Sequence, residues 1–196
     1  GKNFDLIKKV INLGYDSIHY DGSFLPLKEN IKNTKKVISL ARRKGIIVEG
    51  EVGIIRGSSE ELKERFIEKG ENTSVVDAKQ FFKETKVDLL AISIGNVHGV
   101  YKNMPDLDFN LLEGIEKETN ANLVLHGASG IKNNDLKKAI NRGVVKININ
   151  TEIRSIWRDS LKEEILKGEM KPYNIYPKVE ENINKIVEKK INTLGS

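Results

Sequence analysis

The sequence predicts an α/β fold built on a parallel sheet, and it favours a (β/α)8 barrel over a doubly wound sheet. Short apolar segments rich in β-branched residues alternate with amphipathic segments along the whole chain, which is the pattern of repeated βα units. Each apolar segment leads to a polar side chain or a polar loop, as expected where the carboxyl ends of barrel strands carry ligand groups. The glycine fingerprint that commonly follows the first strand of a doubly wound sheet is absent from the sequence.

Apolar spacing and helix-ending glycines assign the elements in chain order. A helix ended by Gly14 leads to a short strand, and a helix ended by Gly45 leads to a strand that carries Glu49 and Glu51. The expected strands are 17–20, 46–52, 87–94, 123–125 and 144–149. The expected helices are 4–13, 27–44, 76–85, 109–119, 133–141, 152–167 and 179–191. A loop with a short helix is expected over 56–74, and a connection over 172–177.

Five strands correspond to part of a barrel, which has eight strands and typically about 250 residues. We therefore expect residues 1–196 to form a single partial barrel domain, with five βα units, strands 4 to 8, and the C-terminal helices. Strands 1 to 3 are expected to be missing from this chain and to precede Gly1. No linker or low-complexity segment divides the sequence into further domains.

The composition is typical of a globular protein, with 38% hydrophobic and 31% charged residues. The chain has no cysteine, so a metal would need imidazole and carboxylate ligands, and a reducing cytoplasm is the expected location. The net charge of +5 comes from lysines spread over helix faces with acidic residues nearby, so we expect no nucleic-acid partner. No apolar segment reaches the ~20 residues of a membrane span, so we expect no membrane partner.

Two of the three histidines, His98 and His126, lie just past apolar segments, and each is followed directly by glycine. Metal and phosphate sites of α/β enzymes often contain an imidazole at the end of a strand, followed by a glycine that leaves space for a ligand. The third histidine, His19, is expected to be structural. Glu49 and Glu51 are expected to face opposite sides of their strand, so that only one of them points into the site.

The loops after the last two expected strands are suited to phosphate. They correspond to the loops after barrel strands 7 and 8, which frequently bind phosphate in barrel enzymes. Small residues let backbone N–H groups converge on an anion, hydroxyl groups add donors, and the following helix contributes the positive end of its dipole. The residues expected to bind phosphate are Gly127, Ala128, Ser129, Asn148, Ile149, Asn150 and Thr151.

Several blocks of the sequence occur in the order and approximate spacing of one known family. The blocks are 14–17, 20–23, 48–53, 88–99, 123–130 and 146–152. On these blocks the chain resembles the class II, metal-dependent ketose-bisphosphate aldolases, of which fructose-bisphosphate and tagatose-bisphosphate aldolases are typical. In that family a His-Leu-Asp-His-Gly motif precedes the matching segment, and Gly1 resembles its glycine. The resemblance implies that the catalytic aspartate base and the first zinc-binding histidine come just before Gly1, and that no certain catalytic residue lies in this chain.

The resemblance also implies roles for residues that the chain contains. His98 and His126 resemble zinc ligands, and Gly99 resembles a residue that contributes to the phosphate site. Glu51 and Asp21 resemble carboxylates near an alternative metal position and in the hydrogen-bonded shell that orients the site. Zn²⁺ is the implied cofactor, and a second divalent or monovalent cation is a further candidate.

The implied reaction is the reversible cleavage of a ketose 1,6-bisphosphate, with fructose 1,6-bisphosphate as the first candidate. The products are dihydroxyacetone phosphate and glyceraldehyde 3-phosphate, formed through a metal-stabilised enediolate. Such a carbon–carbon lyase serves glycolysis and carbohydrate metabolism, and its partner is a small phosphorylated sugar. We expect a homodimer or homotetramer at full length. The isolated fragment is expected to be inactive and, with two imidazoles, to bind zinc poorly.

Two other functions stay open from the sequence. A phosphosugar epimerase or isomerase could use the same metal and phosphate loops, and a truncated barrel could serve as a non-catalytic module. A Schiff-base role for Lys146 is disfavoured because the histidines indicate a metal. Asn96, Asn150 and Tyr173 differ from residues common in the family, so the sequence leaves open which ketose bisphosphate is cleaved and what replaces the family's arginine at the distal phosphate.

Overall fold

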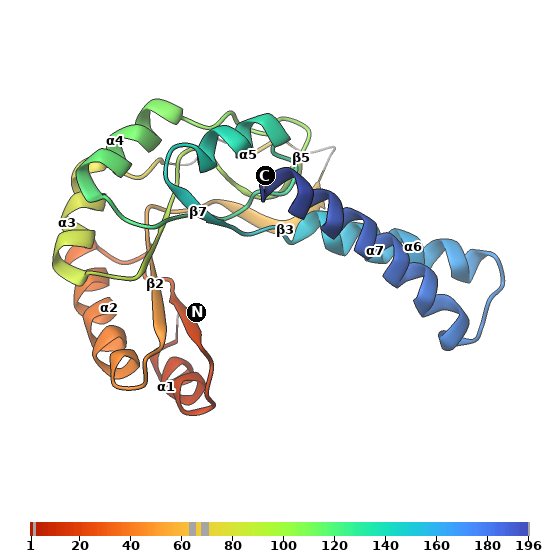
Figure 1. Cartoon of the computed structure of the whole chain (residues 1–196), viewed down its shortest axis with the longest axis horizontal. Helices are drawn as coiled ribbons and strands as arrows, with labels where there is room; N and C mark the ends of the chain where they lie inside the picture. Colours follow the sequence, from red (N-terminus) through yellow and green to blue (C-terminus); the bar gives the residue numbers. More distant parts are fainter. Residues whose placement is uncertain (2, 63–65, 68–70, 196) are drawn as a thin grey trace.

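The computed structural model describes residues 1, 3–62, 66–67 and 71–195, and it is built around one parallel sheet (Figure 1). The strands of this sheet are β1 (Ser17–Tyr20), β2 (Ile47–Val52), β4 (Leu89–Ile92), β6 (Leu123–Leu125) and β7 (Val144–Ile147). Their order in the sheet is β1-β2-β4-β6-β7, the same as their order along the chain, and every neighbouring pair is parallel. Repeated βα units produce this arrangement because each crossover returns the chain beside the strand it has just left. The predicted α/β class and parallel sheet are therefore confirmed.

Helices cover the outer side of the sheet. They are α1 (Phe4–Asn12), α2 (Leu27–Arg42), α3 (Val75–Thr85), α4 (Phe109–Thr119) and α5 (Asn133–Ile140). The first four pack side by side in chain order, and Figure 1 shows α2, α3 and α4 along the periphery of the body. Asn3, Ser74 and Asp108 cap the N-termini of α1, α3 and α4 by accepting hydrogen bonds from backbone N–H groups of the first turn. These helices match the sequence predictions to within a few residues at their ends.

The hydrophobic core lies between these helices and the strands. Phe81 and Leu112 contribute fully buried side chains from helices, and Leu90, Ile92 and Leu123 do so from strands. A strand covered by helices reads as a continuous apolar segment, which is why β4 and β6 were predictable from short apolar runs. The helices cover the apolar side chains of the strands, so polar side chains are expected at the carboxyl ends of the strands.

A second, two-stranded parallel sheet corrects the prediction for the polar segment 56–74. Its strands are β3 (Gly57–Leu62) and β5 (His98–Tyr101). Gly57 pairs with His98 and Leu62 with Tyr101, with a register shift between Gly57 and Glu61. Residues 57–62, expected as part of a loop with a short helix, form a strand, because backbone pairing with β5 holds it although its own sequence has no apolar pattern. Residues 63–65 and 68–70, also part of the expected loop, lie outside the described residues. His98 therefore begins a strand instead of following one.

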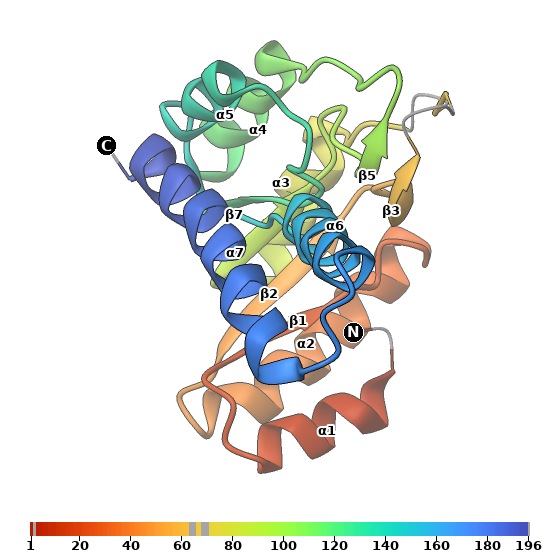
Figure 2. The ribbon, with the colours of Figure 1, turned by 90° about the vertical axis from the view of Figure 1, so that its right-hand side faces the viewer.

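The last two helices form an antiparallel hairpin that projects from the body (Figures 1 and 2). They are α6 (Thr151–Leu166) and α7 (Pro172–Leu194). The connection expected over 172–177 is wrong, since α7 already begins at Pro172 and contains Pro177. An internal proline removes one helical hydrogen bond, but Ile175 and Val179 are buried on either side of it and hold this turn in place.

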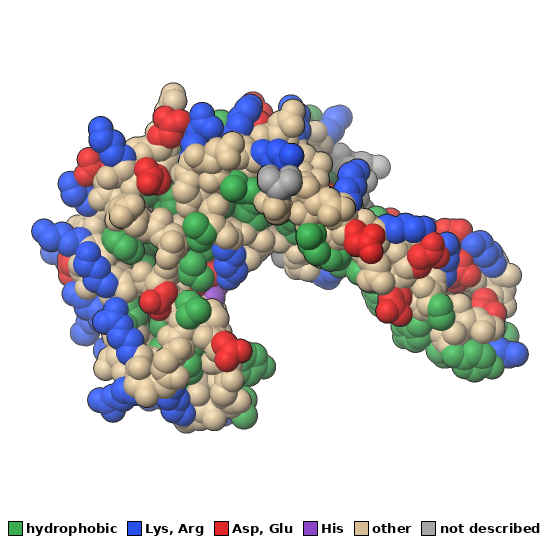
Figure 3. Space-filling view, in the orientation of Figure 1, with side chains coloured by type: hydrophobic (Ala, Val, Ile, Leu, Met, Phe, Trp, Pro, Cys, Tyr) green, Lys and Arg blue, Asp and Glu red, His purple; other side chains and the backbone are tan. Residues whose placement is uncertain are grey.

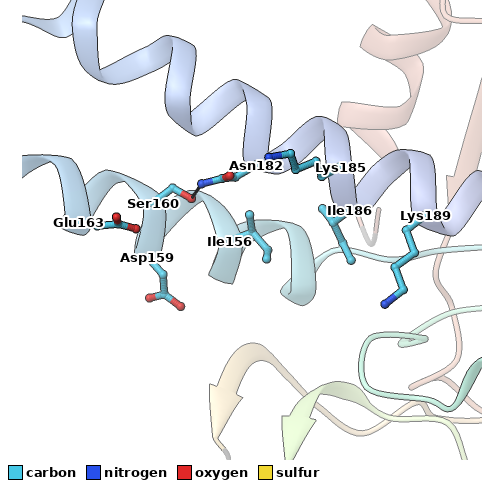
Figure 4. A pocket seen from close by; sticks show the side chains of 8 residues that line it. All are labelled: Ile156, Asp159, Ser160, Glu163, Asn182, Lys185, Ile186 and Lys189. Carbon is cyan, nitrogen blue, oxygen red and sulfur yellow. Dashed lines mark hydrogen bonds between the residues drawn. The ribbon is translucent and has the colours of Figure 1, made fainter.

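A groove of about 380 Å³ runs between α6 and α7 (Figure 4). Asn182 of α7 donates a hydrogen bond to Ser160 of α6 across it, at 2.9 Å. Its other lining residues are isoleucines and charged side chains, without histidine: Ile156, Asp159, Glu163, Lys185, Ile186 and Lys189. The groove is therefore a packing feature of the hairpin. Among the described residues, no helix combines the length and the apolar composition that a membrane crossing requires.

Candidate metal and phosphate site

Titratable side chains from neighbouring strands converge on the concave side of the molecule. His19 lies on β1, Glu49 and Glu51 on β2, His126 directly after β6, and Lys146 on β7. In the space-filling view, histidine is visible in the hollow between the body and the helical hairpin (Figure 3). Because the strands are parallel and adjacent, side chains near their carboxyl ends meet at one edge of the sheet. The sheet thus assembles a cluster of imidazoles, carboxylates and one ammonium group.

Glu49 lies at the centre of this cluster and is fully buried. Its Oε1 lies 2.6 Å from His126 Nε2, and its Oε2 accepts a hydrogen bond from Lys146 Nζ at 2.5 Å. Burial alone would raise the pKa of Glu49, but the hydrogen bonds from His126 and Lys146 outweigh it and lower the pKa to about 2. Glu49 is therefore an ionised acceptor at neutral pH, and Lys146 serves as its ion-pair partner.

The position of Glu49 corrects the expectation that it faces away from Glu51. Residues two apart on a strand point to the same side of the sheet, so both carboxylates of β2 face the site. Glu51 Oε2 lies 3.1 Å from His19 Nε2, and Glu49 Oε1 lies 3.8 Å from the same nitrogen. The correct strand period would have identified the second carboxylate from the sequence.

His19 is also part of the site, contrary to the expectation that it is structural. Its backbone is paired in register with Glu49 across β1 and β2, which places the two side chains on the same face. Its ring centroid lies 5.0 Å from that of His126. Within the part of the chain that the structure describes, His19, Glu51 and His126 form a group whose ligand atoms all lie within 4.8 Å of one another.

His98 approaches the same cluster from β5. Its ring centroid lies 6.1 Å from that of His126, and the two rings are edge to face. Burial lowers the pKa of His98, and nearby His126 lowers it further. A lowered pKa favours the neutral imidazole, the form that binds metals. Asp21 lies in the turn after β1, where its Oδ1 accepts hydrogen bonds from the backbone N–H and the hydroxyl of Ser23.

The two predicted zinc-ligand histidines share a cavity of about 200 Å³ with most of the predicted phosphate-binding residues. The cavity is lined by His98, Gly99, His126, Gly127, Ser129, Asn148, Asn150 and Thr151. Of the other two predicted phosphate residues, Ala128 is buried in the core and Ile149 packs against it. The side chains at the opening therefore combine metal-ligand chemistry with hydrogen-bond donors and small residues.

Hydrogen bonds join the loops that form this cavity. Ser129 Oγ accepts from the backbone N–H groups of Asn150 and Glu152, both at 3.3 Å, which links the loop after β6 to the start of α6. Gly127 has a φ of +63°, and a Cβ there would lie 2.2 Å from the carbonyl oxygen of Val97. Only glycine permits this close approach of the two backbones.

Asn96 is a positioning residue that the sequence singled out only as a departure from the family pattern. It is buried, its Oδ1 accepts from the Ile94 N–H at 2.8 Å, and its Nδ2 donates to the His126 carbonyl at 3.0 Å. The side chain therefore joins the segment after β4 to the backbone of His126. An asparagine shortly after an apolar strand segment was the available signal, but its partner was not visible in the sequence.

Comparison with known proteins assigns the chain to a family. A sequence model described as class-II fructose-bisphosphate aldolase matches residues 1–196. The chain belongs to this family. A fructose-bisphosphate aldolase of Ureaplasma parvum is 45% identical over 161 residues, covering 82% of this chain and 54% of the relative. A 6-phospho-5-dehydro-2-deoxy-D-gluconate aldolase of Shouchella clausii is 38% identical over 198 residues, covering 100% of this chain and 66% of the relative.

Solved structures agree with this assignment. The crystal structure of the YdjI aldolase from Escherichia coli K12 aligns with a TM-score of 0.83 and 29% identity, over 100% of this chain and 66% of the other. The chain therefore has the α/β fold of class II aldolases and belongs to a family of carbon–carbon lyases. It spans about half to two thirds of the length of the curated relatives it matches.

Proposed function

We propose that the full-length protein is a zinc-dependent aldolase that reversibly cleaves fructose 1,6-bisphosphate to dihydroxyacetone phosphate and glyceraldehyde 3-phosphate. One observation carries this proposal: His98 and His126 line the same cavity as the small-residue loops at the start of α6. A sugar phosphate that binds a metal through its carbonyl and hydroxyl oxygens needs its phosphate held within a few ångströms of that metal. This cavity offers both kinds of group.

The residues present fit a catalytic zinc ion. We assign His98 and His126 as its ligands, with Glu51 and Asp21 as the carboxylates that attract and orient the ion. Zn²⁺ bound there would supply Lewis-acid stabilisation of negative charge on the substrate carbonyl oxygen. A second cation remains part of this proposal.

Glu49 fixes which nitrogen of His126 carries the proton. Because the ionised carboxylate can only accept, the Nε2 of His126 must donate to it, which leaves a lone pair on Nδ1. Asn148 Nδ2 lies 3.2 Å from this Nδ1. We propose that Glu49 orients the imidazole and that Lys146 keeps Glu49 ionised. Lys146 then has a positioning role, with no need for a Schiff base.

The phosphate of the substrate is proposed to bind at the N-terminus of α6. Asn150 precedes this helix without a side-chain cap, and Thr151 begins it. The dipole of a 16-residue helix favours an anion at this end. Ser129, Asn148 and the backbone N–H groups around Gly127 supply further donors, and Gly99 leaves the space. Ala128 and Ile149 would contribute through their backbone.

The catalytic base is proposed to lie directly before Gly1. The Gly1 nitrogen donates to the carbonyl of His19 at 2.5 Å, and the Gly1 carbonyl accepts from the N–H of Asp21 at 3.1 Å. Residues that precede Gly1 in a longer chain would therefore run beside β1 and next to the site. We propose a partial barrel domain over 1–196, with three further strands upstream and an aspartate and a histidine just before Gly1, as the resemblance to the aldolase family implies.

The substrate is tested with the full-length protein. Cleavage of fructose 1,6-bisphosphate, tagatose 1,6-bisphosphate and 6-phospho-5-dehydro-2-deoxy-D-gluconate should be measured before and after metal removal. The last compound is included because a relative named for it aligns with the whole chain. We expect metal-dependent cleavage with the fructose compound as the best substrate. Full turnover after chelation would contradict the zinc mechanism, and conversion without carbon–carbon cleavage would favour an epimerase or isomerase.

We also propose that the full-length enzyme acts in the cytoplasm on small phosphorylated sugars, as a homodimer or homotetramer. Its place would be in glycolysis or a related branch of carbohydrate metabolism. Light scattering combined with size-exclusion chromatography measures the oligomeric state directly, and a monomer would contradict that part of the proposal.

A further inference from the structure

The β1 strand adds an imidazole to the site that no assignment above uses. We propose that His19, Glu51 and His126 form a divalent transition-metal site, in which His19 is a direct ligand. This inference rests on the geometry of these three side chains and remains testable if the aldolase proposal fails. It differs from the proposed catalytic zinc position because His19 replaces His98, while His126 and Glu51 are common to both.

The separation of the ligand atoms suits a metal. One ligand atom from each residue lies within 4.8 Å of the other two, and His19 Nε2 lies 3.1 Å from Glu51 Oε2. Nitrogen and oxygen ligands at the usual distances from a tetrahedral Zn²⁺ lie about 3.4 Å apart. The His19–Glu51 pair already has nearly this spacing, and His126 offers the third ligand atom.

His19 Nε2 lacks the hydrogen bond that a buried nitrogen normally makes. It is buried and has no hydrogen-bond partner among the described residues, although Glu51 Oε2 is only 3.1 Å away. His19 Nε2 and Glu51 Oε2 are therefore close to each other but not aligned for a hydrogen bond. Buried polar groups are nearly always satisfied by a partner or an ion. A cation between the two atoms would satisfy both, and the 27% exposure of the His19 side chain gives the ion a route from the hollow.

The charge at this position also favours a cation. Glu49 is neutralised by Lys146, whose ammonium group bonds to its Oε2. Glu51 is buried too, and its side chain contacts His19 instead of a lysine or arginine among the described ion pairs. A buried carboxylate is stable when it is paired or coordinates a metal. Of the two carboxylates on β2, Glu51 is the one left for an ion. With His19 as a third ligand, metal retention would be stronger than two imidazoles allow.

The test is a Co²⁺ titration of the metal-stripped full-length protein, followed by calorimetry and by the visible absorption of the bound ion. His19→Ala should weaken Co²⁺ binding at least about tenfold and change the absorption spectrum. His98→Ala is the companion variant, because it removes the other imidazole near His126; it should weaken binding at the proposed catalytic zinc position but retain a Co²⁺ site with the His19-dependent absorption. His19→Asp should restore much of the binding, since it returns a ligand atom.

Equal affinity and equal spectra for wild type and His19→Ala would overturn the proposal. If His19→Ala does not fold by circular dichroism, His19→Gln provides the same test with a side chain that fills the space but binds metals poorly. Aldol cleavage is assayed separately in His98→Ala. Loss of cleavage with retained Co²⁺ binding supports both proposals, whereas retained cleavage contradicts the catalytic role of His98 and leaves the His19 result to be judged by the binding data.

Discussion

Glu49 Oε1 and His126 Nε2 lie 2.6 Å apart, and this pair couples the middle of β2 to the first residue after β6. The two strands are not neighbours in the sheet, because β4 lies between β2 and β6. A metal-binding imidazole commonly donates its other N–H to a carboxylate, which fixes the tautomer and the ring orientation. The pair therefore connects the stability of the sheet to the chemistry of the site.

Replacing Glu49 with glutamine should weaken metal binding about 10- to 100-fold, because the neutral amide fixes the His126 tautomer less well. It should also lower the free energy of unfolding by about 1–3 kcal/mol, since Lys146 loses its charged partner. Calorimetric Zn²⁺ titration and urea denaturation measure the two effects. The exposed Glu180→Gln is the control and should change neither. Unchanged metal affinity in Glu49→Gln would show that the carboxylate does not orient the ligand.

The stabilising effect of Glu49 should depend on pH. Its pKa is about 2 in the folded protein against an ordinary value of 4.5, so the folded state favours the ionised form. The contribution is fully present above pH 4.5 and is lost as the pH falls from 4.5 towards 2, with a total of roughly 3 kcal/mol. The difference in unfolding free energy between wild type and Glu49→Gln should therefore shrink across this interval. A difference that stays constant from pH 6 to pH 3 would show that the charge of Glu49 is not responsible.

Ser129→Asp should weaken the binding of dihydroxyacetone phosphate at least about tenfold, because it places a carboxylate beside a dianion. The metal content should stay unchanged, since Ser129 contacts the start of α6 and not the imidazoles. Calorimetry with the metal-loaded full-length protein measures the affinity. Ser129→Ala removes the hydroxyl without adding charge and should have a smaller effect. Equal affinity in wild type and Ser129→Asp would place the phosphate elsewhere.

Asn96→Ala should lower the free energy of unfolding by about 1–3 kcal/mol, since it leaves a buried N–H of Ile94 and the carbonyl of His126 without their partner. Chemical denaturation measures this change. Asn122→Ala removes an exposed side-chain hydrogen bond to the Asp88 carbonyl and should cost less. Equal losses in the two variants would argue against the positioning role of Asn96.

The 196-residue chain alone should associate and lack aldolase activity. β1 and β7 are the edge strands of the five-stranded sheet, and unpaired strand edges invite association. Light scattering should show oligomers larger than those of a protein that includes the upstream segment. Metal-dependent cleavage of fructose 1,6-bisphosphate by the purified 196-residue chain would contradict the assignment of the base to residues before Gly1.

The strands and helices were predictable because each βα unit carries its own local pattern. β4 and β6 are apolar throughout, since helices cover them, and capping residues such as Ser74 and Asp108 mark helix starts. β3 was not predictable, because its polar sequence is paired by a strand about 40 residues further along the chain. A strand that is stabilised by a partner so far away in the sequence has no characteristic pattern in its own residues.

The site was predicted in part. His98 and His126 carry a strong signal because each lies shortly after an apolar strand segment and directly before glycine. His19 was missed because it is paired with Glu49 on the adjacent parallel strand, which places its side chain on the face of Glu49 and Glu51. Glu49 was missed because the two-residue period of its own strand was misapplied. The neighbourhood of a side chain on a sheet depends on the register between strands, which a single sequence does not contain.

Because His98 belongs to the two-stranded sheet, its backbone can move without disturbing the five-stranded sheet that carries the other two imidazoles. His19 and His126 are attached to the five-stranded sheet, whereas His98 begins β5, and its N–H bonds to the carbonyl of Arg56 at the entrance to β3. Separation of the β3–β5 pair could release His98 without breaking any pairing in the main sheet. The amide of His98 should then exchange with solvent deuterium faster than the amides of β4, and ligand binding that engages His98 should slow this exchange selectively.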